Sequence, residues 1–242
     1  MTEFPEVDDR IKKVLKLASE LKGRTENLLD IGCGDGINTV LLKEALGASA
    51  VYGIDISPGA CEAAGQRGVD SICFDIEEGI LPFPDEYFDA IFCGEIIEHL
   101  FDTDHLLDEI YRLLKPGCSC IITTPNLAAW YNRLSLLLGF QPHLTAASLE
   151  HYQAGKLFRG TSGGRDHIRV MTLRAFKQLI EHHNFKIDRL VGGYGHFGTP
   201  LPPFIAFAFR TLNKVFCFPS LAGTIIAVLL KTQPPSLISK TN

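Results

Sequence analysis

The sequence predicts an α/β fold in which helices cover both faces of a doubly wound, mostly parallel sheet. Between residues 27 and 123, short apolar runs alternate with segments in which apolar residues recur at helical spacing. Several of these runs end in glycine or aspartate, as in "LLDIGCGDG" and "VYGIDIS". Strands of a parallel sheet are buried on both faces and read as continuous apolar runs, so the pattern predicts parallel rather than antiparallel pairing.

The first half of the chain supplies five predicted strands and the helices between them. Apolar residues from Val7 to Leu21 lie at helical spacing, so we expect an opening amphipathic helix that Gly23 closes. The predicted strands are Asn27–Ile31, Ala50–Ile54, Asp70–Phe74, Ala90–Cys93 and Cys118–Thr123. Helices are predicted at Ile37–Leu46, after the capping residue Ser57, and at Asp104–Leu114, where "KPG" stops the helix.

The alternation breaks down from Pro125 to Asp166, a stretch that contains the only tryptophan of the chain. We interpret it as an insertion over the strand tips, where function collects in such folds. Beyond it we predict a helix at Thr172–Asn184 and strands at Phe185–Val191 and Gly223–Leu230, with His182 and His183 on the surface at the helix end. Residues 1–242 are expected to form one domain, with 126–166 and 195–220 as substrate-side insertions.

Composition narrows the functional classes. The formal net charge is −5 and there is no Lys/Arg-rich run, which argues against a nucleic-acid partner. The seven cysteines are scattered, odd in number and mostly within apolar runs, as expected for reduced thiols. The acidic start "MTEFPEVDDR" has no apolar signal segment, and charged residues or proline interrupt the apolar stretch from Leu201 to Leu230. We therefore expect a cytoplasmic protein.

The segment "LLDIGCGDG" predicts a ligand-binding loop, because glycines after a strand allow a ligand to approach the backbone. Asp55 follows the next strand about 20 residues later, where a carboxylate can accept both hydroxyls of a ribose. Asp75 follows the third strand and is placed to bind an adenine amino group, with Ile76 against the ring. Glycines Gly32, Gly34 and Gly36 depart from the GxGxxG spacing of dinucleotide-binding loops.

These motifs, together with "LPFPDEYFDAIFCGEIIEHL", "LLKPG" and "TPN", resemble the class I S-adenosylmethionine-dependent methyltransferases over residues 27–126. The resemblance implies seven strands with the last one antiparallel. It also implies that the glycine loop holds the methionine part of S-adenosylmethionine, Asp55 the ribose and Asp75 the adenine edge. The cofactor-binding residues expected on this basis are Asp30, Gly32, Cys33, Gly34, Gly36, Asp55, Ile56, Asp75, Ile76, Cys93 and Gly94.

The segment "GEIIEHL" suggests how an acceptor is activated. Helical spacing would place Glu95, Glu98 and His99 on one face, and carboxylates with an imidazole can bind a divalent metal. The segment resembles the Glu-x-x-Glu-His element of ubiquinone-pathway O-methyltransferases and of small-RNA terminal 2′-O-methyltransferases, in which a further histidine completes the set. His167 stands in the matching context here. Glu95, Glu98, His99 and His167 are thus candidate ligands of Mg²⁺ or Mn²⁺. Without metal, His99 or His167 is a candidate general base.

The apolar insertion and a phenylalanine-rich segment at 197–218 favour a small, lipid-linked or sugar-linked hydroxyl acceptor over RNA. The phenylalanine-rich segment has three open interpretations: it packs on the sheet, covers the acceptor, or rests on a membrane surface with Arg210 and Lys214 at the headgroups. Two other functions are also open. One is a nucleotide-dependent oxidoreductase of the same architecture, and the other is a methyltransferase-like binding protein without catalysis.

Overall fold

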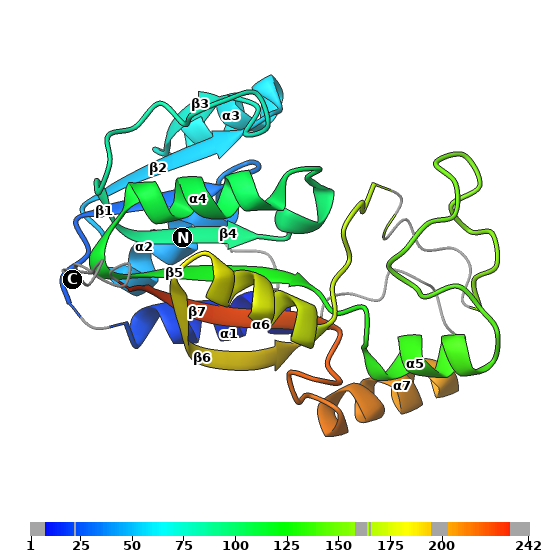
Figure 1. Cartoon of the computed structure of the whole chain (residues 1–242). Coiled ribbons are helices and arrows are strands. Elements are labelled where there is room, and N and C mark those ends of the chain that lie inside the picture. The colour runs from blue at the N-terminus through cyan, green and yellow to red at the C-terminus, as the bar shows by residue number, and fades with distance from the viewer. Residues whose placement is uncertain (1–7, 22, 158–163, 165, 195–202, 233–242) are drawn as a thin grey trace, which may run out of the picture.

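The computed structural model describes residues 8–21, 23–157, 164, 166–194 and 203–232. Within these residues a seven-stranded sheet has the order β3-β2-β1-β4-β5-β7-β6 (Figure 1). Neighbouring strands are parallel except that β7 is antiparallel to both β5 and β6. The strands are β1 Asn27–Ile31, β2 Ala50–Asp55, β3 Asp70–Cys73, β4 Phe88–Gly94, β5 Leu114–Pro125, β6 Phe185–Gly193 and β7 Thr224–Lys231. The predicted doubly wound sheet with an antiparallel last strand is confirmed.

Helices cover the two faces of the sheet because the strands alternate apolar side chains between them. Helices α1 (Asp9–Ser19), α2 (Ile37–Leu46) and α3 (Pro58–Gln66) share one core cluster with Leu28 and Val51 of the strands. Helices α4 (Thr103–Leu113) and α6 (Leu173–His182) share the other cluster. In Figure 1, α4 and α6 lie on the near face of the sheet and α1 and α2 on the far face. Because β1 is parallel to both β2 and β4, the carboxyl ends of these three strands share one edge of the sheet.

The fifth strand is longer than predicted. It starts at Leu114, directly after α4, so Pro116 and Gly117 of "KPG" lie inside the strand instead of in a turn. Both residues are exposed, and the pairing of β4 with β5 shifts register between Phe88 and Ala90. Proline lacks a backbone donor and is tolerated in a strand where the ladder is irregular. The helix does end before "KPG", at Leu113, but the strand begins earlier than the sequence predicts.

Two helices from the expected insertions pack together away from the sheet (Figure 1). They are α5 (Trp130–Leu137) and α7 (Pro203–Val215). The rings of Trp130 and Phe209 lie 5.0 Å apart, and Trp130 Nε1 donates to Asn213 Oδ1 at 2.8 Å. Parts of the expected insertions, including Phe197, lie outside the described residues. Among the described helices, none combines the length and the apolar composition required to cross a bilayer.

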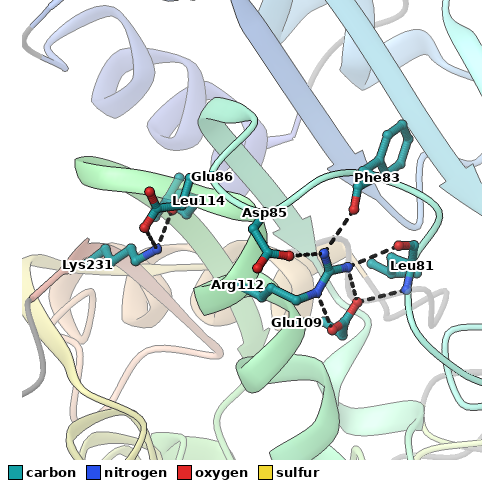
Figure 2. A network of polar contacts seen from close by, with 8 residues as sticks. All are labelled: Leu81, Phe83, Asp85, Glu86, Glu109, Arg112, Leu114 and Lys231. Atoms are coloured by element: carbon teal, nitrogen blue, oxygen red, sulfur yellow. Dashed lines mark hydrogen bonds and ion pairs between the residues drawn. The ribbon is translucent and has the colours of Figure 1, made fainter.

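A polar network anchors the connection between β3 and β4 (Figure 2). Arg112 donates to both carboxylate oxygens of Glu109 at 2.8 and 2.7 Å and to Asp85 Oδ1 at 2.8 Å. It also donates to the carbonyls of Phe83 and Leu81, and Glu109 accepts the Leu81 N–H at 2.7 Å. Burial alone would raise the pKa of Glu109, but these hydrogen bonds hold that pKa below its ordinary value. One guanidinium thus fixes a loop that has no regular secondary structure.

The end of β7 is attached beside this network. Lys231 Nζ donates to Glu86 Oε1 at 3.0 Å and to the carbonyl of Leu114 at 2.8 Å (Figure 2). The contact joins the last strand to the start of β5 and to the loop before β4.

Replacing Arg112 with lysine should lower the free energy of unfolding by about 1–3 kcal/mol, because lysine keeps the charge but loses the fork that serves several acceptors. Urea unfolding of the variant measures this loss. The matched control is Arg67→Lys, since Arg67 is exposed and its ion pair with Asp35 is 3.4 Å long. A loss no larger than that of the control would contradict the anchoring role.

His183 is not on the surface, contrary to the expectation from sequence. Its side chain is 8% exposed, and its Nε2 and Nδ1 donate to Asp104 and Asp108 of α4, each at 2.8 Å. Burial alone would lower the pKa of His183, but the two carboxylates outweigh this effect and raise that pKa. Local sequence does not predict this contact, because Asp104 and Asp108 come from a helix far away in the chain.

The His183 contact predicts a pH-dependent stability. Because the pKa is higher in the folded than in the unfolded chain, the contribution is complete below about pH 6.5 and disappears as the pH rises through the folded-state pKa. His183→Gln should therefore cost on the order of 1 kcal/mol at low pH and less at high pH, with exposed carboxylates limiting the size. His182→Gln is the control. A cost that stays constant or grows with pH would contradict the mechanism.

Candidate functional site

The glycine loop turns sharply at the end of β1. The N–H groups of Gly32 and Cys33 both donate to the carbonyl of Ile54, at 2.7 and 3.0 Å. Gly32 has a φ of +77°, and a Cβ there would lie 2.1 Å from Cδ1 of Ile96. Both the backbone conformation and the space therefore require glycine. Gly36, with a φ of +81°, then forms the N-cap of α2.

Asp55 fixes this loop to the end of β2. Its Oδ2 accepts the N–H of Gly34 and its Oδ1 accepts the N–H of Ser57, both at 2.9 Å. A carboxylate oxygen has a second lone pair, so each oxygen keeps the capacity to accept a ligand hydroxyl. Asp75 is held similarly, with Oδ1 accepting the N–H of Glu77 at 2.9 Å.

A pocket of ≈ 680 Å³ opens at this edge of the sheet. The residues predicted as cofactor contacts that line it come from the ends of three strands: Gly32, Asp55, Ile56, Asp75 and Ile76. The candidate metal residues Glu95, His99 and His167 line the same pocket. Apolar walls come from Ile96, Leu100, Phe101 and Ile168, among others.

Other predicted cofactor residues lie beneath the pocket surface. Asp30 is fully buried and accepts a hydrogen bond from Thr39 of α2 at 2.5 Å, and burial raises its pKa to about 7. Cys33 packs against Gly53, and Cys93 is buried in the core beside α4. The expectation that Cys93 lines the pocket is not met, because its side chain points into the sheet core. Gly34, Gly36 and Gly94 are likewise not among the lining residues.

The end of the insertion is held against the segment after β4. Residues Ile97–His99 form a single 3₁₀ turn, η1. The N–H groups of Ile168 and Arg169 both donate to the carbonyl of Glu98, at 2.7 and 2.9 Å. These two bonds bring His167 next to His99, with ring centroids 4.8 Å apart. Residues far apart in the sequence thus meet through backbone hydrogen bonds.

One ligand atom from each of Glu98, His99 and His167 lies within 4.8 Å of the others. His167 Nδ1 contacts the carbonyl of Leu144 at 3.1 Å, and His99 Nδ1 contacts that of Asp166 at 3.2 Å. A carbonyl can only accept, so Nδ1 donates in both rings and Nε2 carries the free lone pair. Metal-binding histidines are oriented by this kind of partner.

Glu98 is the buried member of the group. Its Oε2 accepts from Thr124 Oγ1 at 3.1 Å, whereas its buried Oε1 has no hydrogen-bond partner among the described residues and lies 4.0 Å from His99 Nε2. Burial and the neighbouring Glu95 raise the pKa of Glu98 to about 8, and burial together with His99 lowers the pKa of His167. An unpartnered buried carboxylate oxygen is costly unless a cation or proton occupies its position. The donor set therefore fits a divalent ion.

Glu95 does not join this group, and the prediction that one helix face carries all the ligands is wrong. Glu95 lies in a bend directly after β4 rather than in a helix, and its φ is +57°. Its N–H donates to the carbonyl of Thr123, and its Oε1 accepts from Thr123 Oγ1 at 2.9 Å. A 3₁₀ turn of three residues is too short to align Glu95 with the residues after it.

Sequence reasoning missed Arg10 of α1. Its guanidinium lies 3.4 Å from Thr123 Oγ1 and 3.8 Å from Oε1 of Glu95, which lines the pocket. In the sequence, Arg10 appears only as one polar residue of an amphipathic helix. Most surface helices carry such residues, so its position does not indicate a site. Ile168 was also missed, although it directly follows His167 in the sequence.

Comparisons with known proteins agree with this geometry. A family model described as a methyltransferase domain matches residues 29–122. A demethylmenaquinone methyltransferase of Listeria monocytogenes is 31% identical over 128 residues, which are 49% of this chain and 53% of the relative. A protein of Oryza sativa named "Probable tocopherol O-methyltransferase, chloroplastic" is 34% identical over 107 residues, 42% of this chain and 29% of the relative. At most, the chain spans about half the length of these curated relatives.

The likeness in fold extends over nearly the whole chain. The crystal structure of an S-adenosylmethionine-dependent methyltransferase from Aquifex aeolicus superimposes with a TM-score of 0.57 at 18% identity. The superposition covers 96% of this chain and 94% of that one.

Proposed function

We propose that this chain, which belongs to the class I S-adenosylmethionine-dependent methyltransferases through its residues 29–122, methylates a hydroxyl group of a small or lipid-linked acceptor. S-adenosylmethionine is the methyl donor that this family implies. In the proposed complex, Gly32 and its loop contact the methionine part, Asp55 accepts the ribose hydroxyls, and Asp75 with Ile76 contacts the adenine.

The observation that carries the proposal is that one pocket is lined both by Gly32, Asp55 and Asp75 and by His99 and His167. Methyl transfer from a sulfonium is an in-line displacement, so the enzyme must mainly align donor and acceptor. A hydroxyl acceptor must in addition lose its proton. The first three residues suit the donor, and the two histidines suit the acceptor. Their place in one pocket supports a direct transfer.

We also propose that Glu98, His99 and His167 hold a divalent ion, with Mn²⁺ favoured over Mg²⁺ because two ligands are imidazoles and Mg²⁺ prefers oxygen. Bound there, the ion would supply Lewis-acid polarisation of the acceptor hydroxyl. The chain's own part is to orient both imidazoles through the carbonyls of Leu144 and Asp166. The alternative is that His99 or His167 takes the proton directly.

The proposed acceptor class is inferred from the apolar side chains that line the pocket and from the names of two relatives. Apolar side chains such as Phe101 and Ile168 face the pocket beside the histidines. The names of the two relatives point to menaquinone and tocopherol precursors, which are lipid-soluble ring compounds. A lipid-linked acceptor resides in a membrane, so peripheral membrane contact through 197–218 belongs to the same proposal. Residues 197–202 of that segment lie outside the described residues.

Asp55→Asn should weaken the binding of S-adenosylhomocysteine by roughly tenfold to a hundredfold, because a charged acceptor for the ribose hydroxyls is lost. Calorimetric titration of the full chain measures the change, with NAD as the control ligand. Asp35→Asn is the matched variant, since Asp35 lies in the same loop but outside the pocket lining. Preferential binding of NAD, or equal effects of the two substitutions, would contradict the assignment.

Glu98→Gln should lower the affinity for Mn²⁺ by roughly a hundredfold, since one of three ligands is removed while the side-chain volume is kept. Glu95→Gln should leave Mn²⁺ binding unchanged, because its carboxylate lies outside the group. Electron paramagnetic resonance counts the free Mn²⁺ in each titration. Equal turnover in chelator and in Mn²⁺ would exclude the metal and favour the histidine base.

A further inference from the structure

A groove of ≈ 630 Å³ lies between α5 and the first turns of α6, apart from the pocket described above. Its apolar walls are Leu127, Leu136 and Leu173. Three cations also line it: Arg133, Arg174 and Lys177. A concave surface that combines leucines with several cations suits an amphiphile with an anionic head.

Among the described residues, the groove cations have no carboxylate partners. Within this part of the chain, Arg133 donates to the carbonyls of Ala128 and Ser220, at 2.7 and 3.1 Å. Arg174 and Lys177 form no ion pair with any described residue. The sequence accounts for Arg133, since it has no Asp or Glu between Glu109 and Glu150.

The neighbouring helix α7 likewise contains cations and no acidic residue. No Asp or Glu follows Asp188, and α7 carries Arg210 and Lys214. In a chain of net charge −5, helices α5 and α7 therefore carry an excess of positive over negative charge.

The same two helices expose large apolar side chains. Leu137 of α5 is 82% exposed, and Phe204 and Phe207 of α7 are 80% and 71% exposed. Further exposed apolar residues of the pair and its flanks are Leu134, Leu136, Leu138, Val215 and Phe218. We call these residues, with the groove cations and with Arg210 and Lys214, the α5–α7 surface. Apolar patches of this extent mark interaction sites, and their combination with cations is typical of helices that lie in a membrane interface.

We propose that the α5–α7 surface docks on an anionic lipid membrane. A phosphate-bearing headgroup, as in phosphatidylglycerol, occupies the groove between Arg133, Arg174 and Lys177, and the exposed leucines and phenylalanines enter the acyl region. Charge complementarity selects this occupant, because an anionic bilayer offers negative charge and apolar chains at one surface. The inference deepens the proposed function by naming where a lipid-linked acceptor is met, but vesicle binding requires no methyl transfer.

Co-sedimentation of the full chain with vesicles tests the proposal. The chain should bind phosphatidylcholine–phosphatidylglycerol vesicles, bind pure phosphatidylcholine at least tenfold more weakly, and lose affinity as salt increases. The triple variant R133Q/R174Q/K177Q should lose roughly a hundredfold in affinity, at about fivefold for each cation. The matched control K12Q/K16Q/K186Q removes the same charge from exposed lysines outside the surface and should bind like the wild type.

Leu137→Ser provides a second test that misfolding cannot confound, since the side chain is almost wholly exposed. It should weaken vesicle binding at least severalfold and leave S-adenosylhomocysteine binding unchanged. Equal losses in the groove and control triples, or no sedimentation with anionic vesicles, would overturn the proposal. Self-association that L137S abolishes, without vesicle binding, would assign the surface to a second copy and also overturn it. Cofactor binding measured in parallel reports on the proposed function separately.

Discussion

The close meeting of three strand ends at Gly32 is the constraint on which the pocket depends. The backbone of Gly32 and Cys33 bonds to the end of β2, and Ile96, just after β4, occupies the space that a side chain at Gly32 would need. Asp55 then ties the loop to β2 by accepting the N–H of Gly34, and the N–H of Ser57 holds this carboxylate in place. Because these contacts are made by backbone groups and one carboxylate, the loop is rigid before any ligand arrives. A preorganised site loses less entropy on binding.

The second half of the pocket is assembled differently. Its histidines come from η1 and from the end of a long insertion, which are joined by two N–H groups that donate to the carbonyl of Glu98. Under the proposed function, the half that binds the donor rests on the sheet, and the half that binds the acceptor rests on a docked segment. This division suits the proposed chemistry, since one fold can serve many acceptors when the segments above the sheet differ. The buried Oε1 of Glu98 has no hydrogen-bond partner among the described residues and marks the place where a cation or a proton would be stabilising.

The sequence predicts the sheet well, and it also predicts that Gly32, Asp55 and Asp75 share one pocket, because the carboxyl ends of parallel strands lie at one edge. It fails where distant segments meet. The spacing of Glu95, Glu98 and His99 suggested a helix face, but the chain forms one 3₁₀ turn and turns Glu95 toward Thr123. His183 looked like a surface residue until Asp104 and Asp108 were placed beside it. Arg10 carries no local signal, since its contacts with Thr123 and Glu95 depend wholly on where α1 packs.

The most direct test of the account is a crystal structure of the chain with S-adenosylhomocysteine and Mn²⁺. We predict that the adenine contacts Asp75 and Ile76, that the ribose hydroxyls bond to Asp55, and that the sulfur faces Glu98, His99 and His167. Electron density for the ligand outside this pocket, or with its sulfur turned away from the two histidines, would contradict the claim that one pocket unites donor and acceptor chemistry.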